Sequence, residues 1–202
     1  MIQPISKLSL AQLPDASIHY IDHFLTMAEA NALFEDLQQN IPWKQDPITV
    51  FGKTFPQPRL TSLHGHTQDP YTYSGITMQP HPMTASLRLI EKKLKQYTEE
   101  DFSSVLLNLY RDGKDSNGWH ADDEASLGIN PVIASVSLGA PRFFHLKQNK
   151  DSSQRVKLLL EHGSLLLMGG QTQHCWKHQI AKTAKHVGPR INLTFRKVFR
   201  SN

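Results

Sequence analysis

Two arginines near the C-terminus have a spacing that could bind an anion with two acidic ends. Arg190 and Arg196 bracket the run Ile191-Asn192-Leu193-Thr194-Phe195, in which apolar and polar side chains alternate. If this run is a β-strand, both arginines lie on one face, with Asn192 and Thr194, and the apolar side chains lie on the other. A buried guanidinium cannot lose its proton and is costly unless an anion pairs with it. The alternative is an exposed edge strand whose arginines meet water or surface acids.

A histidine and a carboxylate at positions i and i+2 occur upstream of these arginines. His120 and Asp122 form this pair, and His178 follows before Arg190. Two imidazoles and one carboxylate make the facial triad of non-haem Fe(II) enzymes, which leaves positions open for a co-substrate and O2. Zinc accepts the same ligand set, so the residues alone also allow a non-catalytic protein with structural zinc.

The length and composition indicate one domain spanning residues 1–202. Cys175 is the only cysteine, so no intrachain disulfide can form and we expect a reducing compartment. No stretch has the roughly 20 apolar residues needed to cross a bilayer, and the first residues lack the apolar core of a signal peptide. We therefore expect a soluble intracellular protein, cytoplasmic or nuclear, and a monomer. The net charge of +4 is compatible with a polyanionic partner.

The hydrophobic pattern predicts a mostly β protein with supporting α-helices. A capping box at Thr26-Met27-Ala28-Glu29 begins one helix, which Pro42 ends, and a second helix is predicted from about 83 to 97. After residue 103 short apolar runs alternate with Gly, Pro and Asn, which favours antiparallel strands in a jelly roll. The predicted strands are 105–110, 132–138, 142–146, 155–160, 164–168 and 191–198. On the first of them Asn108 and Tyr110 share a face.

These motifs together resemble the AlkB group of Fe(II)- and 2-oxoglutarate-dependent nucleic-acid demethylases. The resemblance extends over roughly residues 45 to 199, and its upstream part looks like the branch that repairs alkylated bases in duplex DNA. It is carried by the following segments: Val50-Phe51-Gly52-Lys53, Pro58-Arg59, Tyr71-Thr72-Tyr73-Ser74-Gly75, Asn108-Leu109-Tyr110, His120-Ala121-Asp122-Asp123-Glu124, Ala134-Ser135-Val136-Ser137-Leu138-Gly139, His162-Gly163-Ser164-Leu165-Leu166, His178 and Pro189-Arg190-Ile191-Asn192-Leu193-Thr194-Phe195-Arg196.

The resemblance implies a fold, cofactors and their ligands. The fold would be a double-stranded β-helix, or jelly roll, at 101–202, preceded at 1–100 by an extension with helices and a nucleotide-recognition lid. His120, Asp122 and His178 would be the catalytic iron ligands. The residues expected to hold 2-oxoglutarate are Asn108, Tyr110, Arg190, Thr194 and Arg196. His174 lies on the same face as His178 if both are in a strand, and His178 is preferred because its distance to Arg190 matches the family.

The resemblance also implies the reaction and the substrate contacts. Fe(II), 2-oxoglutarate and O2 would oxidise an N-methyl group on a base such as 1-methyladenine or 3-methylcytosine, yielding formaldehyde, succinate and CO2. The base would be flipped out of DNA, preferably a duplex, although RNA is possible. Phe51 would fill the gap, Tyr73 would stack on the base, and Asp123 or Glu124 would read its polar edge. The expected substrate contacts are Phe51, Gly52, Lys53, Tyr71, Thr72, Tyr73, Asp123 and Glu124.

Two other functions remain open at this point. One is an oxygenase of the same chemistry that acts on RNA or on a protein side chain. It would need the triad and the arginines, but no residue such as Phe51 acting as a wedge that fills the gap left in a duplex by a flipped base. The other is a non-catalytic nucleic-acid-binding module whose His and Asp residues are structural.

Overall fold

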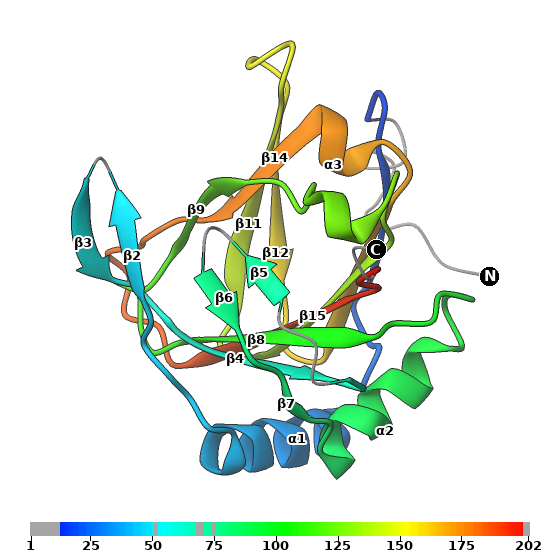
Figure 1. Ribbon diagram of the computed structural model, residues 1–202, viewed down its shortest axis with the longest axis vertical. Helices are drawn as coiled ribbons and strands as arrows, with labels where there is room; N and C mark the ends of the chain where they lie inside the picture. Colours follow the sequence, from blue (N-terminus) through cyan, green and yellow to red (C-terminus); the bar gives the residue numbers. More distant parts are fainter. Residues whose placement is uncertain (1–12, 51, 68–70, 74–75, 200–202) are drawn as a thin grey trace.

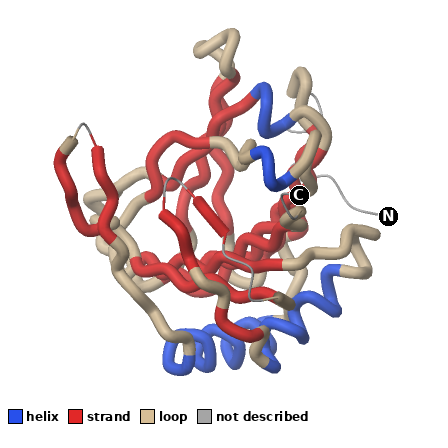
Figure 2. Tube along the Cα trace, in the orientation of Figure 1, coloured by secondary structure: helices blue, strands red, loops and turns tan. Residues whose placement is uncertain are grey.

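The computed structural model describes residues 13–50, 52–67, 71–73 and 76–199, which form two β-sheets, two small hairpins and three α-helices (Figures 1 and 2). The helices are α1 (Met27–Asn40), α2 (Ala85–Leu94) and α3 (Thr172–Cys175). The strands are β1 (Ser17–Ile21), β2 (Pro47–Val50), β3 (Lys53–Pro56), β4 (Leu60–Gly65), β5 (Tyr71–Tyr73), β6 (Ile76–Met78), β7 (His81–Pro82), β8 (Ser104–Tyr110), β9 (Asn117–His120), β10 (Ile133–Gly139), β11 (Arg142–Gln148), β12 (Arg155–Leu160), β13 (Ser164–Gly169), β14 (Trp176–Ile180) and β15 (Arg190–Arg196).

The two sheets pack face to face and define the architecture. The larger has seven strands in the order β1-β13-β10-β15-β8-β4-β7, and the smaller has four in the order β12-β11-β14-β9. All neighbours are antiparallel except β4 and β7. Side chains from both sheets share one buried cluster, in which Leu106 and Tyr110 of β8 pack with Phe144 and Trp176 of the smaller sheet. This arrangement confirms the predicted double-stranded β-helix with supporting helices.

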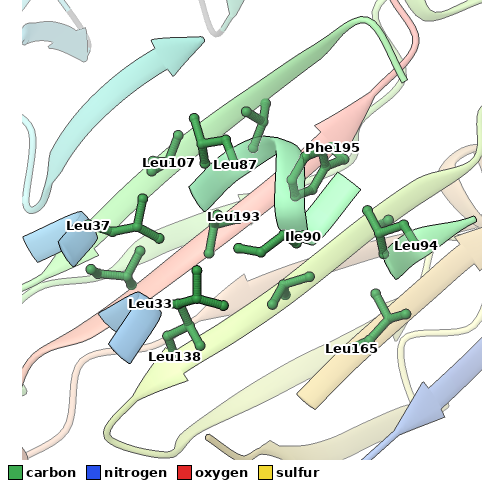
Figure 3. Packing of buried hydrophobic residues seen from close by; sticks show 14 of the residues in the cluster. Leu33, Leu37, Leu87, Ile90, Leu94, Leu107, Leu138, Leu165, Leu193 and Phe195 are labelled. Carbon is green, nitrogen blue, oxygen red and sulfur yellow. The ribbon is translucent and has the colours of Figure 1, made fainter. Parts of the chain in front are cut away.

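Two helices cover the outer face of the seven-stranded sheet. The side chain of Thr26 caps α1 and the Glu29 carboxylate bonds back to the Thr26 backbone N–H, which is the predicted capping box. Thr84 caps α2. In Figure 3 the apolar side chains of both helices lie against those of the strands in the main core. None of the helices in the described part of the chain is long and apolar enough to cross a membrane.

Strand β15 lies in the middle of the seven-stranded sheet and separates the core from the space between the sheets. Ile191, Leu193 and Phe195 are fully buried against the helix side. The alternate residues from Arg190 to Arg196 point the other way, because side chains alternate across a strand. Both arginines are at most 3% exposed, so the alternative of an exposed edge strand is wrong.

Several elements were not predicted from the sequence. All six predicted strands are present, with ends shifted by no more than two residues, but β1 to β7, β9, β14 and α3 were missed. Most of them are short, and their apolar patterns extend over too few residues to stand out. Strands β1, β4 and β7, from the first hundred residues, belong to the seven-stranded sheet. The sheet itself thus has no boundary at residue 100. The predicted division into an extension at 1–100 and a jelly-roll core at 101–202 stays a prediction.

Replacing Leu193 by Ala should lower the free energy of unfolding by about 2–5 kcal/mol, because it leaves a cavity where α1, α2 and the sheet meet. The change is measured by urea unfolding. Leu89 on α2 is 49% exposed and provides the matched control, for which Leu89→Ala should change stability by less than about 0.5 kcal/mol. Equal losses in the two variants would contradict this account of the core.

Candidate active site

Three potential metal ligands meet at the edge of the four-stranded sheet. His120 ends β9 and lies directly opposite His178 of β14, while Asp122 follows in the loop after β9. One ligand atom from each residue lies within 4.8 Å of the others, and this is the only such cluster in the described part of the chain. The Asp122 Oδ2 atom is 3.7 Å from His178 Nε2. The structure thus brings together the three predicted ligands.

Hydrogen bonding and burial keep the imidazoles ready to act as ligands. His120 Nδ1 lies 2.7 Å from the Gly118 carbonyl oxygen and must donate to it, which leaves the lone pair on Nε2. Burial lowers the pKa of His178 to about 3, and burial also lowers the pKa of His120. Both rings are therefore neutral at pH 7, which is the protonation state that binds a metal. The ring of Phe144 stacks on His178 with centroids 5.0 Å apart.

The third ligand is held as a carboxylate by a buried arginine. Arg196 Nη2 donates to Asp122 Oδ1 at 2.5 Å, and both side chains are at most 3% exposed. Burial alone would raise the pKa of Asp122, but Arg196, with smaller contributions from His178 and His120, lowers it to about 2. Arg196 thus contacts the metal-binding group itself, and its expected contact with 2-oxoglutarate stays a prediction.

The other arginine has unsatisfied donors inside the protein. Arg190 is 1% exposed, and its Nη2 donates to Ser137 Oγ at 2.8 Å. Its Nε and Nη1 are buried with no hydrogen-bond partner among the described residues. Burial lowers the pKa of Arg190 to about 10, so the group is still a cation at neutral pH. The guanidinium lies 5.3 Å from the centre of the Tyr110 ring. Such a group needs an anion.

One cavity connects the histidines with both arginines. It has about 430 Å³ of empty space, part of it open to solvent. Its walls come from β8, β15 and β10 on one side and from β9 and β14 on the other. All the predicted iron and 2-oxoglutarate residues line it, namely Asn108, Tyr110, His120, Asp122, His178, Arg190, Thr194 and Arg196. A site with three iron ligands at one end and an unpaired guanidinium at the other fits an Fe(II)-chelating dicarboxylate.

Several residues that support this cavity were not identified as site residues from the sequence. Arg59 on the neighbouring segment donates from Nε to Asn108 Oδ1 at 2.7 Å, and both are buried. Asn192 also lines the cavity and donates to Ser135 Oγ at 2.8 Å. Strand alternation could have found Asn192, because it lies between Arg190 and Thr194 on the same face. Arg59 belongs to the family-like Pro58-Arg59 segment, but nothing in the sequence indicated its contact with Asn108.

Gln173 is a further supporting residue that the sequence did not reveal. It is 1% exposed on α3, and its Oε1 accepts the backbone N–H of Asp122 at 2.9 Å. Its Nε2 lies 3.7 Å from the sulfur of Met168. The contact fixes the loop that carries the metal-binding carboxylate.

One local expectation about the histidines needs correction. His174 does not share a strand face with His178, because α3 ends at Cys175 and β14 begins only afterwards. The helix leaves His174 exposed and outside the cavity.

Of the predicted substrate residues, Gly52, Lys53, Asp123 and Glu124 do not line this cavity. Gly52 and Lys53 are exposed at the tip of the β2–β3 hairpin, which projects from the body at the left of Figure 1. Gly52 has a φ of +74°, which the turn requires. Tyr71, Thr72 and Tyr73 form β5, and the predicted wedge Phe51 lies outside the described residues.

The two acidic residues that follow Asp122 have different environments. Asp123 is exposed, whereas Glu124 is half-buried. The Oε2 atom of Glu124 is buried with no hydrogen-bond partner among the residues that the structure describes. Burial raises the pKa of this carboxyl group.

Comparison with known proteins defines the class. A family profile described as the 2OG-Fe(II) oxygenase superfamily matches residues 17–196. The solved structure titled "The structure of OsALKBH1" superposes with a TM-score of 0.62 at 21% identity, covering 92% of this chain and 100% of that chain. This likeness shows the same fold. The family match and the facial triad together imply Fe(II) and 2-oxoglutarate as cofactors.

Curated relatives narrow the class further. Alpha-ketoglutarate-dependent dioxygenase alkB homolog 3 of Bos taurus is 44% identical over 87% of this chain and 64% of that protein. The same-named protein of Mus musculus is 41% identical over 96% of this chain and 71% of that protein. DNA oxidative demethylase ALKBH2 of Homo sapiens is 38% identical over 85% of this chain and 69% of that protein. The chain therefore belongs to the AlkB family of 2OG-Fe(II) dioxygenases. It spans just under two thirds of the bovine relative's length.

Replacing Gln173 by Leu should weaken metal binding by about 10- to 100-fold, because groups that orient metal ligands typically contribute this much. Mn(II) binding is measured by titration calorimetry on the metal-free protein. Gln171, two residues earlier and exposed, gives the control variant Gln171→Leu, which should bind Mn(II) like the wild type. Unchanged affinity in the Gln173 variant would show that the Asp122 loop needs no such support.

Proposed function

We propose that this protein is an oxidative demethylase of N-alkylated bases in DNA. Its activity would consume 2-oxoglutarate and O2 and release formaldehyde, succinate and CO2. The names of two relatives support this class of reaction, since one is an alpha-ketoglutarate-dependent dioxygenase and the other a DNA oxidative demethylase. The observation that carries the proposal is the single cavity that joins the triad to the unpaired Arg190 guanidinium. A structural zinc site needs only its own ligands and would not explain a buried guanidinium in the same cavity.

The side chains of the cavity divide the work of holding the cofactors. His120, Asp122 and His178 would hold Fe(II), which with 2-oxoglutarate as the reducing co-substrate would activate O2, the oxidant that hydroxylates a C–H bond. Arg190 would bind the distal carboxylate through its unpaired Nε and Nη1 donors. Arg196 would keep Asp122 ionised in the closed site.

Three polar side chains would complete the 2-oxoglutarate site. Tyr110 pairs with Arg190 across β8 and β15, whereas Thr194 lies two residues from Arg196; both line the cavity with hydroxyl groups that can donate hydrogen bonds. Asn108 accepts from Arg59 at its carbonyl oxygen, so its amide N–H groups are available as donors to an anion. Most of these donors are buried, so each bond contributes more than it would in water.

The carboxylate of Glu124 suits a positively charged lesion. Methylation of adenine at N1 or of cytosine at N3 gives a cationic base, and Glu124 presents a buried, unsatisfied oxygen one residue beyond the exposed Asp123. A cation placed beside this group would stabilise its ionised form. Tyr71, Thr72 and Tyr73 on β5 would form the lid over the flipped base, with Tyr73 stacking against it.

The β2–β3 hairpin would open the duplex. We propose that Phe51 enters the gap left by the flipped base, with Gly52 forming the turn and Lys53 binding a phosphate. A duplex preference depends on this wedge, because single-stranded DNA or RNA has no pair to separate. An oxygenase that acts on RNA or protein would not need it.

Replacing Arg190 by Met should raise the 2-oxoglutarate concentration for half-saturation by about 100-fold or more, because two charge-assisted hydrogen bonds of about 1.5–3 kcal/mol each are lost. Binding is followed anaerobically by the visible charge-transfer absorption of the Fe(II) complex. The chemical control is 2-oxobutyrate, which lacks the distal carboxylate and should bind wild type and variant equally. An equal loss for both acids would place the distal carboxylate elsewhere.

Incubation with Fe(II), 2-oxoglutarate and oligonucleotides carrying 1-methyladenine or 3-methylcytosine should give formaldehyde and the repaired base, both measured by mass spectrometry. Asp122→Ala should abolish turnover on every substrate.

Phe51→Ala should slow duplex repair by about 10- to 100-fold, because opening a base pair costs a few kcal/mol, and it should leave single-strand repair intact. Phe199→Ala, which changes an exposed phenylalanine after β15, is the control. Undiminished duplex repair by the Phe51 variant would refute the wedge.

A further inference from the structure

The outward face of the four-stranded sheet carries positive charge without any negative charge. The inward residues of β11 and β14 are buried, so their alternate residues point to solvent. Every residue of β9, β11, β12 and β14 is described, and none is Asp or Glu. Four cations lie on the outward face, namely Lys147, Arg155, Lys157 and Lys177.

Three of these cations form a row across three adjacent strands. Lys147 of β11 is directly opposite Arg155 of β12 on one side and Lys177 of β14 on the other. Strand spacing makes the row about 10 Å long. Like charges directly opposite each other on a sheet destabilise it, and none of the three forms an ion pair with a carboxylate in the described part of the chain. An anion lying across the row would relieve this repulsion.

Aromatic side chains lie among the cations on the same face. The Nζ of Lys147 is 4.4 Å from the centre of the Trp119 ring on β9. The Nζ of Lys157 is 3.9 Å from the Phe143 ring, which is 41% exposed. Cations that follow a phosphate backbone, combined with rings on which bases can stack, characterise surfaces that bind nucleic acid without regard to sequence. The carboxylates of an acidic protein would pair with the cations, but they would not stack on the exposed aromatic rings as bases do.

The face is continuous with the candidate active site through β9. Trp119 points outward, and the next residue, His120, points into the cavity. A strand of nucleic acid that leaves the cavity over this edge would therefore reach Trp119 first and then the row of cations. This path needs no movement of the sheet.

We propose that this outward face, formed by Trp119, Phe143, Lys147, Arg155, Lys157 and Lys177, binds the phosphate backbone of the nucleic-acid strand outside the lesion. The proposal rests on the proposed function in taking nucleic acid as the partner. It extends that function by assigning two tasks to two places: the outward face would provide affinity for the strand, and the cavity would recognise the damaged base. The lowered pKa of His145 between these groups, caused first by burial and then by Lys157, agrees with a positive local field.

The test uses the full chain and an unmodified fluorescent single-stranded oligonucleotide of about 30 nucleotides, longer than the roughly 16 that one module covers. Binding is measured by anisotropy at a series of salt concentrations for Lys147→Gln/Lys177→Gln. The control is Arg88→Gln/Lys92→Gln, which removes the same charge from exposed positions on α2, across the seven-stranded sheet. Neither iron nor a lesion is present, so the result does not depend on demethylation.

Log affinity falls linearly with log salt concentration, and each phosphate contact on a single strand adds about 0.7 to the steepness of this fall. In the Lys147/Lys177 variant, which loses two contacts, we expect the slope to be less steep by about 1.4. The control variant should keep the wild-type slope. Thermal unfolding of the Lys147/Lys177 variant should be unchanged or shifted to higher temperature, because repulsion along the row is relieved. Repair of a methylated trinucleotide should be unaffected, while repair of the long substrate should show a raised KM.

Equal slopes in wild type and variant, or an equal loss in the control variant, would overturn the proposal. Binding of polyglutamate that depends on Lys147 and Lys177, with oligonucleotide binding unchanged, would assign the face to an acidic protein and also overturn it. If the wild type demethylates nothing while the slope still falls in the variant, the proposed function fails and the nucleic-acid-binding face stands.

Discussion

The burial of two guanidiniums on one face of β15 is the constraint on which the rest of the structure depends. Arg190 and Arg196 lie between two sheets, where each is at most 3% exposed to solvent. An unpaired charge in such a place typically destabilises a protein by several kcal/mol. Arg196 is compensated by Asp122, and the same contact keeps that carboxylate ionised for a metal. Arg190 has no such partner among the described residues, so the carboxylate that we propose for it would stabilise the fold as well as complete the site.

The sequence revealed the parts of the fold and of the site that depend on periodicity. Alternation over seven residues was sufficient to place Arg190, Thr194 and Arg196 on one face. The capping box at Thr26 likewise identified the start of α1. Triad membership came from the family resemblance, because an H-x-D pair at 120 and 122 is too common to identify a metal site by itself.

What the sequence did not reveal depends on contacts between distant segments. Gln173 and Asp122 are 51 positions apart, and Arg59 and Asn108 are 49 apart, so no local pattern connects either pair. The row of cations on the outward face has the same origin. Lys147 and Arg155 flank one hairpin loop, but Lys177 lies far from both in the sequence and becomes their neighbour only through strand register.

The two faces of β15 tolerate different kinds of change. Each apolar residue on the helix side could be exchanged for another of similar volume, since cores accept such swaps at modest cost. Inserting or deleting one residue within the strand would have a different result. Every side chain beyond the change would move to the opposite face, so a guanidinium would enter the core and a leucine or phenylalanine the cavity. The number of residues in this strand is thus more tightly constrained than the identity of half of them.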